Sequence, residues 1–140
     1  MRYIFFLVVG LSLHACGSSE TQNKPLNPNG DSELALLMRE MYDDGQRIKQ
    51  EIKNGNKPAI LKKFKEIHTA DATEPEKVAT DAYRMYADAY LNSLALLEAA
   101  GPDDVESSYH AMVQSCITCH RELCPGPIVR IKKLMIAENK

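Results

Sequence analysis

Apolar side chains recur every three to four residues along four stretches of this chain, the spacing that places them on one face of an α-helix. The first stretch begins after Asp31 and Ser32, either of which can cap a helix, and it ends at Gly55. Its core-facing positions are Leu34, Met38, Met41, Gly45, Ile48 and Ile52. This stretch predicts a long helix with a single buried stripe.

Two further stretches continue the pattern as far as Gly101. The second predicted helix begins at Asn56, with Pro58 in the first turn, where proline is tolerated. Its apolar positions are Ile60, Leu61, Phe64 and Ile67. The third begins with the capping box Thr73–Glu76, and Gly101 is expected to end it. Its apolar positions are Val78, Ala82, Met85, Tyr86, Ala89, Tyr90, Leu94 and Leu97.

A fourth predicted helix begins at Asp103, with Glu106 as the reciprocal cap, and ends before Pro125. Its core-facing positions are Val105, Tyr109, Met112, Val113, Cys116, Cys119, His120 and Leu123. Residues 128–136 form a short amphipathic extension. Because short loops join antiparallel neighbours, we expect residues 31–140 to form an all-α, antiparallel up-down-up-down four-helix bundle with a short C-terminal extension.

The N-terminus differs from the rest in composition. Residues 1–15 combine a basic start with a short apolar run, which indicates a signal peptide. This run ends at Leu13-His14-Ala15-Cys16, which resembles a bacterial lipobox and implies a diacylglyceryl group on the sulfur of Cys16. The alternative is an ordinary secretory signal, with Cys16 unmodified. Residues 16–30 are polar and predict a flexible tether, so the expected location is the periplasmic side of the cell envelope, anchored to the membrane by lipid.

The length, the charge and the motifs of the chain exclude several classes of function. A chain of 140 residues suits one compact domain. The net charge of −2 and the pI of about 6.1 argue against a nucleic-acid partner. We see no acid–base pair, nucleophile constellation or phosphate-binding loop, so we do not expect the protein to be an enzyme.

The strongest chemical signal is the sequence Cys116-Ile117-Thr118-Cys119-His120. A Cys-x-x-Cys-His motif is typical of covalent haem attachment, in which both thiols form thioethers and the histidine binds the iron. On a helix these three residues share one face. We therefore predict one covalent haem c held by Cys116, Cys119 and His120.

Two other kinds of site use similar residues. A thiol–disulfide centre also contains Cys-x-x-Cys, but it usually lies at a strand–helix junction, which this sequence does not predict. A zinc ion could be bound by Cys116, Cys119, Cys124 and His120, although an oxidising compartment disfavours a thiolate site.

The second axial ligand of the iron is expected on the first helix. Met38 lies as far from the start of that helix as His120 lies from the end of the fourth, so antiparallel packing places them at the same depth. Met41, one turn deeper, is the alternative, and either methionine could simply fill the core. His68 and His110 are weaker candidates, since His110 shares a helix with His120.

From Ser32 to Leu123 the chain resembles the cytochrome c′ family, including its low-spin members. These are four-helix bundles with the haem motif on the last helix and the sixth-ligand position early in the first. Met38 matches that position best, which implies a single-electron carrier with redox partner proteins. The alternative is a high-spin protein that binds NO or CO. Members often dimerise, so a homodimer is a further expectation; a lipid anchor and an extension after the motif are departures.

Two features of the extension stay open at this stage. Cys124 is either an inert buried thiol, a partner in an intermolecular disulfide, or a redox-sensitive thiol. Arg130, Lys132 and Lys133 form either a solvated face or a basic patch that steers an acidic redox partner.

Overall fold

The computed structural model of the chain describes residues 30–137, and these residues are helical wherever their structure is regular. The predicted signal peptide, Cys16 and all but the last residue of the predicted tether lie outside the described residues. The elements are α1 (Glu33–Lys53), η1 (Lys65–His68), α2 (Pro75–Val78), α3 (Asp81–Ala99), α4 (Val105–Leu123), α5 (Ile128–Ile131) and η2 (Lys132–Leu134), where η is a 3₁₀-helix. No strand occurs between residues 30 and 137. The predicted all-α class is confirmed.

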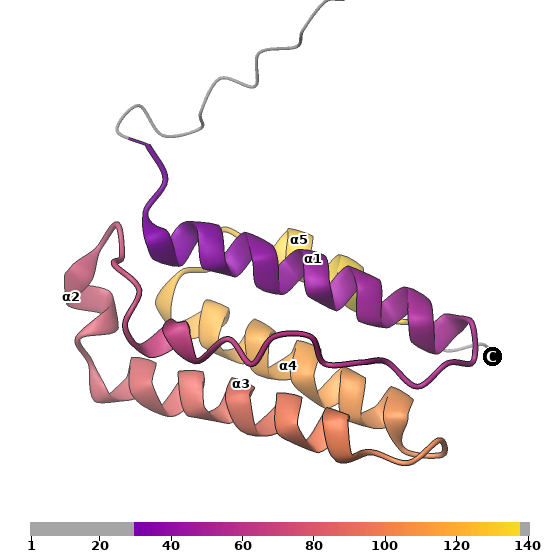
Figure 1. Ribbon diagram of the computed structural model, residues 1–140. Helices are drawn as coiled ribbons and strands as arrows, with labels where there is room; N and C mark the ends of the chain where they lie inside the picture. Colours follow the sequence, from indigo (N-terminus) through magenta and orange to yellow (C-terminus); the bar gives the residue numbers. More distant parts are fainter. Residues whose placement is uncertain (1–29, 138–140) are drawn as a thin grey trace, which may run out of the picture.

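The three long helices determine which ends of the chain meet. In Figure 1, α1 and α3 run in the same direction and α4 runs in the opposite direction. Residues 54–64 return along the molecule between α1 and α3. The beginning of α1 and the end of α4 therefore lie at the same end of the molecule, beside the short helix α2.

The predicted second helix is wrong over most of its length, because residues 56–64 are not helical and only η1 follows them. Side chains of α1 bind the backbone groups that a helix would need: the Arg47 guanidinium donates to the carbonyl of Ala59 (2.7 Å), and the N–H of Ala59 donates to the Glu51 carboxylate (3.2 Å). Phe64 is fully buried with φ at 52°. The apolar side chain of Phe64 thus reaches the core from a non-helical backbone.

The predicted start of the third helix is also wrong. The long helix α3 begins at Asp81, and its cap is Thr80, whose Oγ1 accepts from the N–H of Tyr83 (3.1 Å). Thr73 instead donates to the hydroxyl of Ser32 (3.0 Å). The expected single helix is therefore divided into a short helix, α2, and a long helix, α3, that begins six residues after Pro75.

Of the remaining predicted helix caps, those of α1 are right and those at the end of α3 and the start of α4 are wrong. Ser32 caps α1 through the N–H of Ala35 (3.2 Å), and Gly55 follows the helix with φ at 75°, both as predicted. By contrast, α3 ends at Ala99, its C-cap is Ala100, and Gly101 is not among the described glycines with positive φ. The N-cap of α4 is Asp104, which makes no side-chain capping bond, so the predicted box starting at Asp103 does not form.

The C-terminal extension, residues 125–137, packs back against α1. The buried hydroxyl of Tyr109 donates to the carbonyls of Leu134 (2.9 Å) and Gly45 (3.1 Å). Lys49 donates to the carbonyls of Lys133 (2.9 Å) and Met135 (2.8 Å). A Cβ on Gly45 would come within 3.3 Å of the Leu134 side chain, so glycine permits this close approach.

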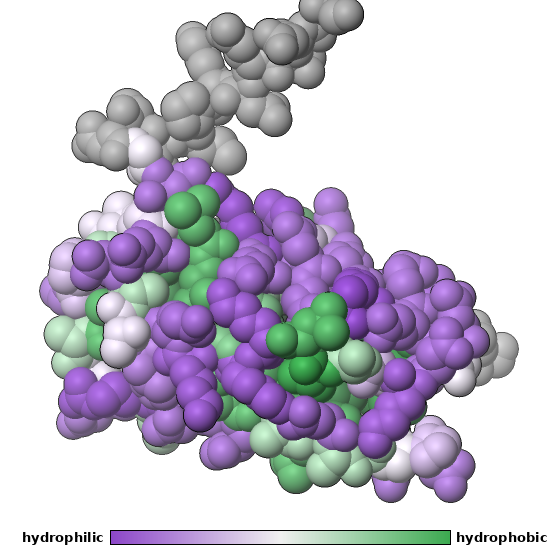
Figure 2. Space-filling model, viewed as in Figure 1, coloured by the Kyte–Doolittle hydropathy of each residue, from purple (hydrophilic) through white to green (hydrophobic). Residues whose placement is uncertain are grey.

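The surface is mainly polar. Figure 2 shows a largely hydrophilic face on which hydrophobic side chains gather in a few areas. Over residues 30–137, no helix combines the length and the hydrophobicity that crossing a membrane requires.

Candidate functional site

The three residues of the haem motif lie near the C-terminal end of α4. His120 is buried, whereas Cys116 and Cys119 are half-buried. Among the described residues, Cys116, Cys119 and Cys124 are all free thiols. The motif is helical throughout, as the spacing predicted.

Three cavities border this part of α4. The α2 cavity, of about 240 Å³, is lined by α1, α2 and α4 and includes Lys77. The central cavity, of about 30 Å³, includes Tyr86 of α3. The tail cavity, of about 630 Å³, is lined by α1, α4 and the C-terminal extension and includes Arg130. Met38 and His120 are the two residues that line all three cavities, so these spaces meet around their side chains.

The two cysteines lie on opposite sides of that meeting point. Cys119 lines the α2 and central cavities, and Cys116 lines the central and tail cavities. Cys116, Cys119, His120 and Met38 therefore all line cavities at this end of the molecule. Met41 lines only the central and tail cavities and is 9% exposed, which places it deeper in the core.

The other two histidines of residues 30–137 lie elsewhere. His68 places Nε2 3.0 Å from the carboxylate of Asp88. His110 lies beside Tyr109, and its Nε2 is buried with no hydrogen-bond partner among the described residues. Neither histidine lines any of the three cavities.

The two ring nitrogens of His120 have different surroundings. Nδ1 lies 3.1 Å from the backbone carbonyl of Cys124 and 3.4 Å from the Cys124 thiol. Because a carbonyl only accepts, the shorter contact favours the tautomer in which Nδ1 carries the proton. This tautomer leaves a lone pair on Nε2, the arrangement usual for a metal-binding histidine. Burial lowers the pKa of His120, although the bond to the Cys124 carbonyl opposes this. The imidazole is therefore favoured in its neutral, ligating form.

The thiols are not activated for exchange. Burial raises the pKa of Cys116 to about 12 and that of Cys119 to about 11, and it also raises the pKa of Cys124. Thiol–disulfide centres instead rely on cysteines whose pKa is lowered. The environment of these cysteines gives no support to that alternative.

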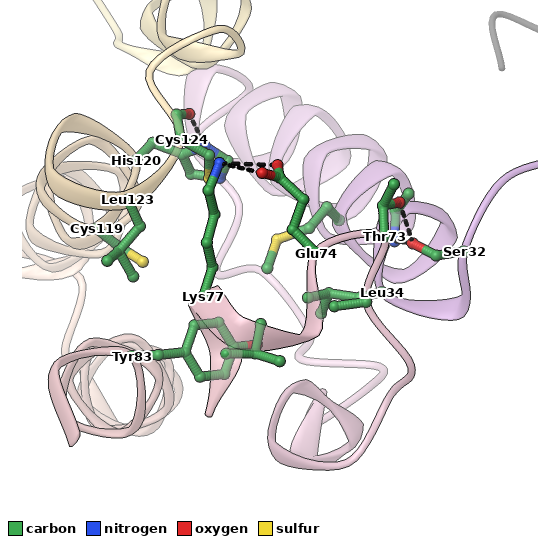
Figure 3. A pocket seen from close by; sticks show the side chains of 14 residues that line it. Ser32, Leu34, Thr73, Glu74, Lys77, Tyr83, Cys119, His120, Leu123 and Cys124 are labelled. Atoms are coloured by element: carbon green, nitrogen blue, oxygen red, sulfur yellow. Dashed lines mark hydrogen bonds and ion pairs between the residues drawn. The ribbon is translucent and has the colours of Figure 1, made fainter. Parts of the chain in front are cut away.

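The α2 cavity has a polar rim. Figure 3 shows Lys77 extending beside His120 and Cys124 toward Glu74, and the Lys77 ammonium lies 2.7 Å from the Glu74 carboxylate. The hydrogen bond to Glu74 raises the pKa of Lys77. The wall deeper in this cavity includes Tyr83, whose hydroxyl donates to the carbonyl of Ile67 (2.6 Å).

Tyr90 is a wall residue whose importance the sequence did not reveal. It is 5% exposed and lines the central and tail cavities. The described residues provide no hydrogen bond to its hydroxyl, although the buried hydroxyls of Tyr83 and Tyr109 both have carbonyl partners. In the sequence, Tyr90 is simply one of eight apolar-stripe positions of the third predicted helix, so periodicity could not distinguish it.

The available donor atoms suit a covalently held haem. Two thiols and an imidazole come from one helix face, and a methionine sulfur comes from another helix at the same end of the molecule. A haem iron takes histidine and methionine as axial ligands in many cytochromes c. Cofactor cavities typically measure about 300–1,000 Å³, a range that includes the tail cavity.

A site for a bare metal ion would require more ligands in one place. Residues 30–137 contain no group of three or more His, Cys, Asp or Glu side chains that could hold a metal ion together. The zinc alternative thus gains no support from the positions of Cys116, Cys119, Cys124 and His120.

Comparison of the sequence and the fold with known proteins found no matching family model, no matching curated protein and no matching solved structure.

Proposed function

We propose that the protein is a c-type cytochrome that carries single electrons. The observation that carries this proposal is that Met38 and His120 line all three cavities, while Cys116 and Cys119 border the same region. No enzymatic activity is part of the proposal.

Each residue has a distinct role in this proposal. Cys116 and Cys119 form the thioether bonds, and His120 offers Nε2 to the iron while the Cys124 carbonyl holds its ring. Met38 supplies the second axial ligand from α1. The haem supplies the one-electron couple, and methionine with histidine raises its potential.

The fold is consistent with a modified four-helix bundle. α1, α3 and α4 take three of the bundle positions, and residues 54–64 run where a second helix would return. We propose that the chain is a divergent relative of the cytochrome c′ family, in which this segment has lost its helix. The C-terminal extension is a second departure from that resemblance.

The proposed setting is the periplasmic side of the cell envelope. The sequence before the described residues supports export and a lipid on Cys16. The proposed partners are redox proteins, met at the membrane surface. A homodimer follows from the family resemblance alone.

The test begins with haem content. The full chain, produced in bacteria that mature c-type cytochromes, should keep its colour after acid-acetone extraction, and Cys116→Ala and Cys119→Ala should each remove one thioether. Cys124→Ala is the matched control, because Cys124 contributes its backbone carbonyl and should leave attachment intact. Free extraction of the haem from the unmutated protein would contradict the proposal.

A second candidate, a haem protein that binds NO or CO, is favoured by one observation. Met38 is only half-buried and borders cavities on several sides, so space for a small ligand is close to its sulfur. Absorption spectra separate the two functions. A low-spin spectrum and slow CO binding support the electron carrier, whereas a high-spin spectrum and rapid CO binding support the gas-binding protein.

A further inference from the structure

The tail cavity has a buried end and an exposed end. The buried part of its wall includes Met112 and Tyr90, beside the half-buried Cys116. At the exposed end lie Arg39 of α1 and Arg130 of α5, whose side chains are 39% and 56% exposed. The cavity thus extends from a haem-motif cysteine to a pair of arginines.

The exposed end carries two cations, each facing one carboxylate that is not part of the cavity wall. Arg39 makes two bonds to the Asp31 carboxylate (2.5 and 2.7 Å). Arg130 lies 4.3 Å above the ring of Tyr42 and 4.0 Å from the carboxylate of Asp43, a weak contact. No Asp or Glu among the described residues lines the tail cavity itself. In the α2 cavity, by contrast, the lysine is paired with a glutamate of the same wall.

We propose that Arg39 and Arg130 bind the propionate carboxylates of the haem; this inference rests on the proposed haem attachment. Thioether bonds fix one edge of a haem, and both propionates extend from the opposite edge. Cys116 lines the tail cavity together with both arginines, so from that thioether the propionates would have a route through this cavity to the arginines. A guanidinium matches a carboxylate through two parallel hydrogen bonds, and Arg130 has most of its donors available for this.

The C-terminal extension gains a function from this assignment. It brings Arg130 to the cavity, and its own position is fixed by the Tyr109 hydroxyl and by Lys49, which bind its backbone carbonyls. Ile131 and Leu134 of the same segment are buried and line the cavity beside Arg130. The segment therefore completes the wall and supplies a cation to it.

The experiment compares holoprotein variants by resonance Raman spectroscopy and redox titration. Arg130→Gln should shift the propionate bending bands and lower the reduction potential, because a cation that stabilises ferrous haem is removed. Arg39→Gln should shift the same bands. Lys132→Gln is the matched control: it removes one charge from the same segment, but Lys132 does not line the cavity, so the bands should not move. Arg130→Lys, which keeps the charge, should retain most of the potential.

Other outcomes overturn the assignment. Bands that shift in Lys77→Gln but not in Arg39→Gln or Arg130→Gln would place the propionates in the α2 cavity instead. Unchanged bands in both arginine variants, with haem attached, would contradict this inference and leave the proposed function standing. Absence of haem from the unmutated protein would contradict the proposed function itself.

Discussion

His120 shows how a single backbone group can prepare a side chain for its role. The Cys124 carbonyl accepts from Nδ1 because α4 ends at Leu123 and Cys124 turns away from the helix, with φ −156° and ψ 80°. Pro125 favours that extended conformation in the residue before it. The motif spacing predicted which face His120 occupies, but it could not predict this bond, which depends on the backbone just beyond the helix.

Met38 and Met41 are expected to respond differently to truncation. Met38→Ala should convert a low-spin spectrum to high-spin and remove the near-infrared sulfur-to-iron band, because Met38 borders every cavity that His120 borders. Met41→Ala should keep the spectrum and reduce the free energy of unfolding by about 2–5 kcal/mol, because it leaves a cavity in the core. Absorption spectra and denaturant titrations measure both effects, and an exchange of the two phenotypes would make Met41 the ligand.

At the scale of elements, periodicity predicted the long helices well and the intervening segment poorly. The predicted stripes of α1 and α4 are largely buried. In α3 the predicted stripe is wrong over its first half, because Ala82, Met85 and Ala89 are exposed and Tyr83 and Ala87 are buried instead. In residues 56–64 the same spacing was present, but Arg47 and Glu51 bind the backbone of Ala59, and Leu61 is left 72% exposed. The spacing of apolar residues within 56–64 cannot reveal these bonds, because their side chains come from α1, 8 and 12 residues earlier in the sequence.

The caps offer a direct test of where α3 begins. Thr80→Ala should lower the free energy of unfolding by about 1 kcal/mol, because Oγ1 of Thr80 satisfies the N–H of Tyr83. Thr73→Ala is the comparison, since Thr73 occupies the cap position that the sequence favoured but bonds to Ser32 on the surface. Its loss should be within about 0.5 kcal/mol in the same denaturant titration. If Thr73→Ala lowered the free energy of unfolding more than Thr80→Ala did, the third helix would begin at Thr73, as the sequence predicted.

Tyr109 links α4 to α1 and to the C-terminal extension. Tyr109→Phe should lower the free energy of unfolding by about 1–3 kcal/mol, because the buried carbonyl of Leu134 loses its donor. Tyr42→Phe is a suitable control: its hydroxyl is bound to Gln46 at a half-buried position, so little stability should be lost. Denaturant titration of the two variants compares them, and equal losses would show that the buried bond does not hold the extension.

At the scale of the whole molecule, the candidate site lies where five parts of the chain converge. The beginning of α1, the short helix α2, α3, the end of α4 and the C-terminal extension all contribute walls. The antiparallel relation of α1 and α4 was predictable from loop lengths and helix depth. The contributions of α2 and the extension were not, because each is too short for its periodicity to fix its packing partner.

The lipid anchor predicted at Cys16 would hold the protein at the membrane surface. Two acyl chains on Cys16 would anchor the protein stably, whereas a single chain gives only marginal membrane binding. We expect the unmutated protein in the membrane fraction, with a diacylglyceryl N-terminal peptide in mass spectra. Cys16→Ser should abolish this modification and prevent anchoring by lipid, while any chain that is still exported keeps its haem, because Cys16 precedes the domain that holds Cys116, Cys119 and His120. An unmodified N-terminus at another residue of the natural protein would contradict the anchor and place a soluble carrier in the periplasm.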